Sequence, residues 1–236
     1  MSDTIETKIM DELISNINDE KYNSNDKLPS ENDLADVYGI PRIKVRKAYE
    51  RLEEMGYIYS RQGKGRYLRP RHKQIDLILS GNESFSEKII NKGYDFLSKN
   101  IMFEKIQYDE KIFKELGEDV DGEVYKIGRL RIIDKIPIAL HISYVSSVTF
   151  PGIEVLGKNI SSMFQYYRNN GYSEIISEKS ILSVSFPTEQ ERKIFECSSL
   201  IPLLVLETNS IDAKTKKVLE FTKIVYRCDH FKYIIY

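Results

Sequence analysis

Two arginines separated by one residue, Arg129 and Arg131, are the clearest candidates for ligand chemistry in this chain. They fall in a run, 124–133, whose composition predicts a β-strand. Successive side chains point to opposite faces of a strand, so both guanidinium groups project from one face. Two cations that face a sheet interior repel each other unless an anion lies between them. Either neighbouring Asp or Glu side chains neutralise the pair structurally, or a phosphate, sulfate or carboxylate of a bound ligand does so.

A second candidate is a basic stretch that suits nucleic acid. Residues 42–73 hold 11 Lys and Arg against 3 Asp and Glu, whereas residues 1–41 hold 3 against 10. The formal net charge of −1 therefore hides a local excess of positive charge. Because salt screens charges beyond about 8 Å at physiological ionic strength, DNA phosphates respond to this local excess. The stretch predicts a DNA-contacting surface, and its alternative is a solvated helix face.

The residue types give little indication of catalysis, metal binding or membrane insertion. Cys197 and Cys228 lack metal-like spacing, which predicts buried packing in a reducing cytosol. Beyond the basic stretch we find no nucleophile elbow, metal cluster or paired carboxylates. The N-terminus is polar and acidic, and no apolar run reaches the roughly 20 residues that span a bilayer. We therefore expect a cytoplasmic protein that is not an enzyme and uses no metal, cofactor or membrane.

Apolar spacing and capping residues predict the elements that position the basic stretch. Residues 5–17 repeat apolar side chains every four positions, as in an amphipathic helix. Ser30 is a typical N-cap for a second helix, which Gly39 ends. A third helix from Pro41 to Met55 carries the basic side chains, and a hairpin follows around Gln62–Gly65. This order of parts is that of a winged helix-turn-helix, which places one helix in the DNA major groove.

Residues 5–69 resemble the DNA-binding domain of the GntR family of bacterial transcription regulators. The resemblance rests on Leu28-Pro29-Ser30-Glu31, Leu34-Ala35, Gly39, Arg42, Val45-Arg46, Leu52, Gly56 and Gly63-Lys64-Gly65. It implies that the third helix contacts bases or phosphates and that the hairpin tip enters the minor groove, which suits arginine chemistry. The DNA-contacting residues so implied are Ser30, Asn32, Arg42, Lys44, Arg46, Lys47, Gln62, Gly63 and Lys64.

Three places depart from the family pattern. Asn32 stands where many members have an arginine, Pro41 replaces a serine, and Ile43-Lys44 replaces a small hydroxyl pair. These changes remove two contacts and add one, so we expect an operator different from the commonest sequence of the family.

Beyond residue 70 the pattern changes to long strands with short helices between them. We expect helices at 84–91, 109–116, 161–169 and 188–195, and strands at 100–108, 124–133, 138–145, 172–186, 203–212 and 219–236. Such a pattern indicates an α+β domain on an antiparallel sheet. The predicted organisation is a winged helix-turn-helix at 1–70, a linker at 71–79, and an effector-binding and dimerisation domain at 80–236.

Residues 80–236 resemble the UTRA effector domain of the HutC-like branch of the GntR family, which has a chorismate-lyase-like fold. The resemblance rests on Ser84-Phe85, Arg129-Leu130-Arg131, Pro137-Ile138, Ser162-Met163-Phe164, Pro202-Leu203-Leu204, Glu220 and Tyr226-Arg227 with Asp229. It implies a ligand cleft lined by Ser84, Phe85, Arg129, Arg131, Ser162, Glu220 and Tyr226. His141 joins this set because sugar-phosphate-responsive members often carry glutamate there; its alternative is a structural role.

Together these features predict a ligand-responsive transcription regulator that represses its genes. A homodimer would bind a pseudo-palindromic double-stranded operator and leave it when a small anionic effector, such as a sugar phosphate, binds. One alternative is a constitutive DNA-binding protein whose second domain only dimerises. Another is an enzyme that kept a chorismate-lyase-like sheet and gained a DNA-binding module.

Overall fold

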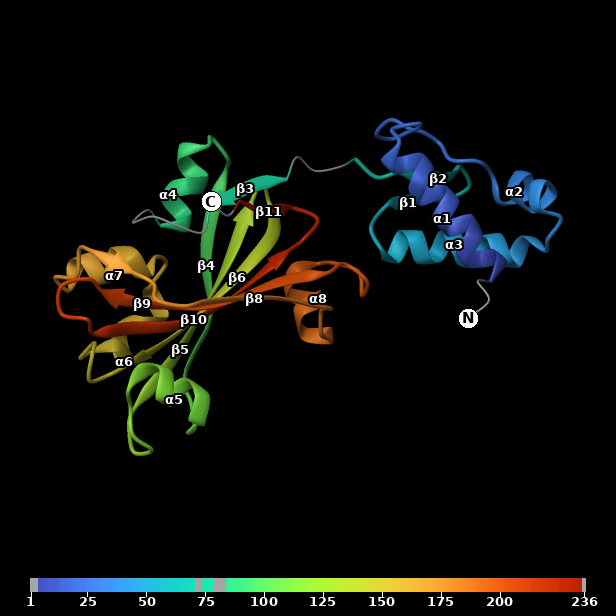
Figure 1. The fold of residues 1–236 in the computed structure, drawn as a ribbon. Coiled ribbons are helices and arrows are strands. Elements are labelled where there is room, and N and C mark those ends of the chain that lie inside the picture. The colour runs from blue at the N-terminus through green and yellow to red at the C-terminus, as the bar shows by residue number, and fades with distance from the viewer. Residues whose placement is uncertain (1–3, 71–73, 79–83, 235–236) are drawn as a thin grey trace. The chain divides into compact units, whose positions relative to one another are not determined.

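The structure is a computed structural model that describes residues 4–70, 74–78 and 84–234 (Figure 1). It divides into two compact units, an N-terminal unit of three helices and a hairpin and a larger unit built on a sheet. The α+β class that the sequence predicts is confirmed. Residues 71–73 and 79 of the predicted linker, and 1–3, 80–83 and 235–236 of the predicted domains, lie outside the described residues.

Twenty elements follow one another in the part of the chain that the structure describes, and their bounds agree with most of the predicted ones. The N-terminal unit contains α1 (Ile5–Asn18), α2 (Glu31–Tyr38), α3 (Arg42–Glu54), β1 (Ile58–Arg61) and β2 (Gly65–Leu68). The remaining elements are β3 (Ile75–Ile78), α4 (Phe85–Asn91), β4 (Phe96–Lys105), α5 (Glu110–Leu116), β5 (Val124–Ile133), β6 (Ile136–Ser146), α6 (Ile153–Leu156), the 3₁₀ turn η1 (Gly157–Asn159), α7 (Met163–Asn169), β7 (Ile175–Ile176), β8 (Ser180–Ser185), α8 (Glu189–Phe195), β9 (Leu203–Asp212), β10 (Val218–Arg227) and β11 (Phe231–Ile234).

The N-terminal unit forms because three short helices bury one apolar stripe each in a shared core. The side chains that fill this core come from every element of the unit: Ile9, Leu13, Ile17, Leu28, Ala35, Val45, Ala48, Tyr49, Leu52, Ile58 and Leu68. Ser30 caps α2 as predicted, since its hydroxyl accepts from the Asp33 amide at 3.1 Å and Asp33 accepts from the Ser30 amide. Gly39 ends α2 in the left-handed conformation that glycine tolerates, at φ 62°.

The second unit is built on an antiparallel sheet in the order β4-β5-β6-β10-β9-β7, with β8 also paired to β9 (Figure 1). The β5–β6 hairpin turns at Asp134 and Lys135, which both have positive φ, as a two-residue turn of this twist requires. α4 and α7 pack on one face of the sheet, whereas Phe113 of α5 packs with Phe221 on the opposite face. The two faces thus have separate apolar cores.

The predicted long strand 172–186 is wrong in one respect, because it is interrupted. β7 pairs Ile175 with Asp212, and β8 pairs Ser180 with Thr208, so the two registers on β9 differ by one residue. Between them the Thr208 hydroxyl accepts or donates hydrogen bonds with the Ser177 and Ser180 hydroxyls, at 2.6 and 2.9 Å. These side-chain bonds replace the regular ladder at the interruption.

The predicted final strand 219–236 is also wrong as a single element. β10 ends at Arg227, where the His230 amide donates to the Arg227 carbonyl at 3.1 Å and forms a turn. The Arg227 guanidinium donates to both carboxylate oxygens of Asp229, at 3.1 and 2.7 Å, and holds that turn. The chain continues as β11, which pairs in parallel with β3 (residues 75–78), so this part of the predicted linker is a strand.

Candidate DNA interface and effector site

The basic side chains of α3 lie on its exposed face, opposite the buried stripe. Arg42, Lys44 and Arg46 have 55%, 45% and 41% of their side-chain surface exposed, and Lys47 is exposed as well. This places the predicted helix contacts on one surface in the first half of α3. The sequence positions alone predicted this face, because Val45, Ala48 and Tyr49 are buried on the other side.

Glu31, the first residue of α2, gathers three arginines from two elements. It accepts from Arg42 Nε at 2.7 Å and from Arg46 Nε and Nη2 at 3.3 Å, and it lies 3.5 Å from Nη2 of Arg66 on β2. Burial would raise the pKa of Glu31, but the hydrogen bonds from Arg42 and Arg46 outweigh it and lower the pKa. Glu31 is therefore anionic at neutral pH and orients these guanidiniums.

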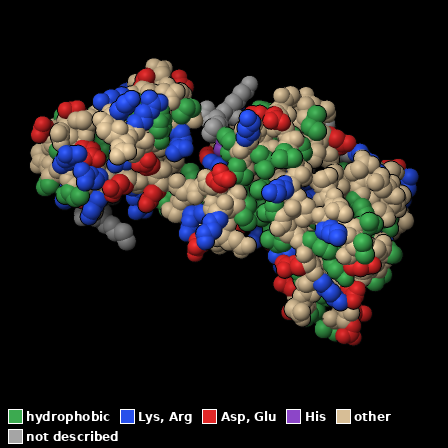
Figure 2. Space-filling view, turned by 180° about the vertical axis from the view of Figure 1, so that it is seen from behind, with side chains coloured by type: hydrophobic (Ala, Val, Ile, Leu, Met, Phe, Trp, Pro, Cys, Tyr) green, Lys and Arg blue, Asp and Glu red, His purple; other side chains and the backbone are tan. Residues whose placement is uncertain are grey.

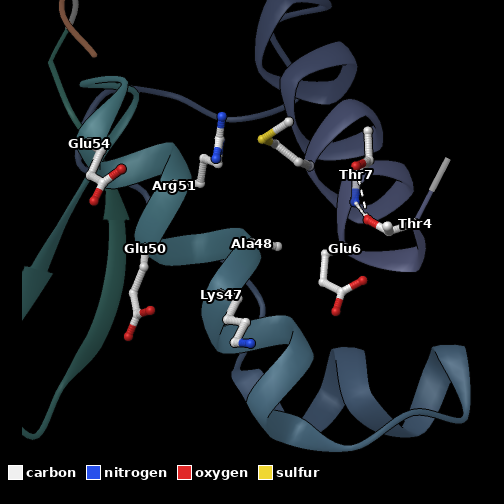
Figure 3. Close-up of a pocket in the computed structure, with 9 residues that line it drawn as sticks. Thr4, Glu6, Thr7, Lys47, Ala48, Glu50, Arg51 and Glu54 are labelled. Atoms are coloured by element: carbon white, nitrogen blue, oxygen red, sulfur yellow. Dashed lines mark hydrogen bonds between the residues drawn. The ribbon is translucent and has the colours of Figure 1, made fainter. Parts of the chain in front are cut away.

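Lys44 and Lys47 lie near the start of α1. Lys44 Nζ is 3.7 Å from Glu6 Oε1. A shallow groove runs between α1 and α3, and Lys47, Glu6 and Glu54 line it together with Glu50 and Arg51 (Figure 3). Three carboxylates and two cations border this groove, so it is a poor site for an anion. Lys47 lies at its rim, where its side chain is exposed.

The remaining predicted DNA contacts are exposed at the two ends of this surface. Ser30 and Asn32 are exposed at the start of α2, and Gln62, Gly63 and Lys64 form the exposed tip of the β1–β2 wing. Gly63 has φ 69°, a conformation that the tight turn requires and that glycine adopts without strain. In the space-filling view, Lys and Arg side chains gather on the N-terminal unit, interspersed with carboxylates (Figure 2).

In the second unit the structure brings together most of the predicted effector residues on one face of the sheet. Arg129 and Arg131 are 3% and 2% exposed, and Ser84, His141, Glu220 and Tyr226 are buried too. The strand register places Arg129 of β5 opposite His141 of β6. Apolar clusters flank these residues on both sides, one around Tyr167 and one around Phe231. The polar side chains therefore form a polar island within an apolar core.

The polar island supplies hydrogen-bond acceptors for only some of the N–H groups of the two guanidiniums. Arg129 donates to the Ser143 hydroxyl, and Arg131 donates to the Ser98 hydroxyl and, at 2.9 Å, to the Ser161 carbonyl. The Nε atoms of both arginines have no hydrogen-bond partner among the residues that the structure describes. Burial lowers the pKa of Arg129, and burial and the Arg129 charge lower the pKa of Arg131.

Glu220 is the nearby carboxylate, and it neutralises at most one of the two cations. It accepts from the Ser210 hydroxyl at 3.3 Å through Oε1, while Oε2 is buried without a partner among the described residues. Within the described ranges, neither Arg129 nor Arg131 has a carboxylate oxygen within 4 Å. Burial and the Glu220 charge raise the pKa of the Tyr167 hydroxyl, which is neutral as a result. The cluster keeps an excess of positive charge.

Phe85 of α4 packs against Arg131 and His141. Its ring lies 4.8 Å from the His141 ring and 5.8 Å from Arg131 Cζ. The Tyr226 ring lies 6.1 Å from Phe85 and 5.7 Å from His141, so the three rings contact one another. Phe85 is positioned because Ser84 caps α4, in a capping box with Glu87.

Ser162 differs from the other predicted effector residues. Its hydroxyl caps α7 by accepting from the Gln165 amide at 3.4 Å, and it is only half-buried. The group that reaches Arg131 is instead the carbonyl of the preceding residue, Ser161. The structure thus gives Ser162 a helix-capping role next to the site.

Sequence reasoning missed five polar residues of these two sites. They are Glu31, Ser98, Ser143, Tyr167 and Ser210. Ser143 had a usable signal, because it follows His141 by two positions on the same strand and so shares its face. The others become neighbours only through pairing of distant strands and helices.

The chain combines a winged helix-turn-helix with a sheet domain that contains a buried, under-neutralised basic cluster. This combination defines the class of transcription regulators that join a DNA-binding domain to an effector-binding domain. Residues 5–68 match the family described as bacterial regulatory proteins, gntR family, and residues 91–232 match the UTRA domain. The chain belongs to the GntR family of bacterial transcription regulators and carries a C-terminal UTRA domain. This confirms the resemblance seen in the sequence, and it makes the chain a regulator rather than an enzyme.

Individual relatives agree with this assignment. The HTH-type transcriptional repressor NagR of Bacillus subtilis is 28% identical over 235 residues, which cover 97% of this chain and 93% of that protein. A probable fructoselysine utilization operon transcriptional repressor of Escherichia coli K12 is 22% identical over 91% of this chain and 86% of its own length. The crystal structure of PhnF from Mycobacterium smegmatis shares the fold, with a TM-score of 0.62 at 19% identity, covering 97% of this chain and 98% of that one.

None of the helices in the described part of the chain is long and apolar enough to cross a membrane.

Proposed function

We propose that the protein is a repressor that leaves its operator when a small anionic effector binds at Arg129 and Arg131. The observation that carries this proposal is the imbalance of the buried cluster. Among the described residues, two guanidiniums with unpartnered Nε atoms face one carboxylate, Glu220, in a place that water-exposed counterions do not reach. An isolated buried cation is costly, so a native site that keeps two of them is suited to receive an anion.

The effector class follows from the same geometry. A phosphate or carboxylate accepts hydrogen bonds from guanidinium groups in well-aligned pairs. Glu220 and the hydroxyl of Tyr167 are suited to hydroxyl groups on the rest of the molecule. The set matches a small polar compound with one anionic end, such as a sugar phosphate. Repression is supported by the names of two relatives, a transcriptional repressor and a probable transcriptional repressor.

DNA binding is assigned to the α3 surface and the wing. The exposed side chains of Arg42, Lys44 and Arg46 have the reach to contact bases or phosphates in the major groove. Gln62 and Lys64 at the wing tip then lie toward the adjacent minor groove. Asn32 and Ser30 add contacts at the start of α2.

A homodimer on a pseudo-palindromic operator is the proposed assembly, because one α3 helix reads only a half-site. The edge strand β8 supports it. β8 pairs only with β9 among the described strands, and Ile181, Leu182 and Val184 on it are 45%, 41% and 65% exposed. An apolar edge of this kind is a surface that a second copy can cover. Light scattering after gel filtration tests the assembly, and Val184→Lys should shift it toward the monomer.

The central experiment is a fluorescence anisotropy titration on the intergenic DNA next to the gene. The expected result is specific, salt-sensitive binding that is reversed by one member of a panel of phosphorylated sugars, amino acids and phosphonates. Binding that no anion reverses would favour the constitutive alternative, in which the second domain only dimerises. Turnover of a panel compound, rather than stoichiometric binding, would revive the enzyme alternative.

A further inference from the structure

The imidazole of His141 lies near both guanidiniums, whose charges act on it. It is 6% exposed, and its Nε2 atom is buried without a hydrogen-bond partner among the described residues. In the β5–β6 register it stands opposite Arg129 and next to the pair formed by Arg131 and Ala139. A buried polar atom without a partner marks a place where a bound molecule can complete the hydrogen bonding.

The ring is held in place rather than free to turn away. Phe85 and Tyr226 contact it in edge-on geometry, at 4.8 and 5.7 Å between ring centroids. Phe85 also lies over Arg131, 5.8 Å from Cζ. The imidazole and this guanidinium therefore contact the same aromatic ring.

The charge of the whole cluster decides what His141 does. The charged and titratable groups around it are Arg129 and Arg131 from β5, Glu220 and Tyr226 from β10, and Tyr167 from α7. α4 contributes Ser84 and Phe85 here, since its Glu87 pairs with Arg168 instead. With His141 neutral, two cations and one anion leave a formal charge of one positive. A monoanionic ligand cancels this charge, whereas a dianionic ligand leaves one negative charge in the buried site.

We propose that His141 takes up one proton when a dianion binds at Arg129 and Arg131, and that it thereby selects dianionic effectors, such as phosphate monoesters, over monoanionic carboxylates. This inference rests on the proposed function of the cluster as an anion site. The proton comes from bulk water and binds the unprotonated imidazole nitrogen, and no bond of the effector breaks. The imidazolium then donates a hydrogen bond to the anion, and the site returns to neutrality.

The ligand-free protein is prepared for this uptake. Burial, together with the charges of Arg131 and Arg129, holds the pKa of His141 well below its usual range, so the ring is neutral at pH 7. A dianion placed among these groups reverses the sign of the local potential and raises that pKa. A group whose pKa rises on binding makes binding tighter as the pH falls, by up to about tenfold per pH unit.

Sulfate is a suitable probe for the full-length protein, because it stays dianionic across the neutral range and any pH dependence then belongs to the protein. We would measure its affinity from the shift in melting temperature at about pH 6, 7 and 8. The chain has three histidines, so the Cε1–H resonance of His141 can be assigned with His141→Gln and titrated with and without sulfate. Nitrate serves as a monoanionic control.

The expected result is that sulfate raises the titration midpoint of the His141 resonance and binds more tightly at low pH. Nitrate should not raise the midpoint, and His141→Gln should bind sulfate with no such pH dependence. Sulfate binding that requires both arginines but leaves the His141 midpoint unmoved overturns this inference and spares the proposed anion site. Absence of any arginine-dependent sulfate binding overturns both. The wild-type resonance gives the answer even where His141→Gln does not fold.

Discussion

Glu31 accepts a hydrogen bond from Arg42 Nε at 2.7 Å, and this bond ties the first turn of α2 to the first turn of α3. The same carboxylate holds Arg46 and approaches Arg66 of the wing. One anion therefore holds guanidiniums of both α3 and the wing.

Replacing Arg46 with alanine should weaken operator binding by about 1–3 kcal/mol if the side chain makes a bidentate base contact. Fluorescence anisotropy at fixed salt measures this loss. Arg51→Ala is the matched control, because Arg51 lies on the same helix but in its last turn. Equal losses in the two variants would mean that only the total charge of α3 matters.

Glu31→Gln should raise affinity for unrelated DNA and reduce the preference for the operator. The substitution removes the anion that orients Arg42 and Arg46, so these arginines become available to any phosphate. Titrations with operator and scrambled duplexes over a salt series measure the ratio of affinities and the salt slope, which should become steeper. Glu50→Gln makes the same charge change on the exposed face of α3. If it has the same effect, orientation by Glu31 is not the cause.

Arg131→Met should leave the ligand-free protein within about 1 kcal/mol of the wild type, because removing one of two buried like charges relieves repulsion while the apolar stem is kept. It should nevertheless abolish stabilisation by anionic effectors. Differential scanning fluorimetry with and without phosphate or sulfate measures both effects. Lys126→Gln is the control on the same strand, since Lys126 instead pairs with Glu104. A large loss of stability without ligand would support the structural alternative for the arginine pair.

The Glu87–Arg168 ion pair should make stability depend on pH in the acid range. The pair joins the first turn of α4 to the last turn of α7 at 2.8 Å, and the bond from Arg168 is the largest cause that lowers the pKa of Glu87 to about 2. Because the pKa in the folded state lies below the unfolded value near 4.5, the contribution is complete above about pH 4.5 and disappears as the pH falls toward 2.

Glu87→Gln removes the stability that the Glu87–Arg168 pair contributes. The difference in melting temperature between wild type and variant should therefore shrink as the pH falls from about 4.5 toward 2. Arg168→Gln should behave alike, and the double variant should lose little more than either single variant. Losses that simply add would show that the two residues act independently.

Most of the N-terminal unit could be predicted from the sequence because its signals are local. The Ser30–Asp33 capping box, Gly39 and the apolar spacing of α1 and α3 act within a few residues of each other, and all appear in the structure. The strands β5 and β6 were predicted for a similar reason, since the Asp134–Lys135 turn lies directly between them. The interruption of 172–186 was missed because it depends on side chains of the distant strand β9.

In the effector site, too, the sequence predicted the local features, whereas the contacts between distant elements could not be predicted. The alternation around Arg129 and Arg131 by itself determined that both guanidiniums share one face of a strand. Only the tertiary structure decided that they are buried, that Glu220 is the carboxylate acting on them within the described part of the chain, and that Phe85 packs against Arg131 and His141. The physical reason is that alternation is a property of one strand, whereas burial and charge balance depend on which distant strands and helices pack together.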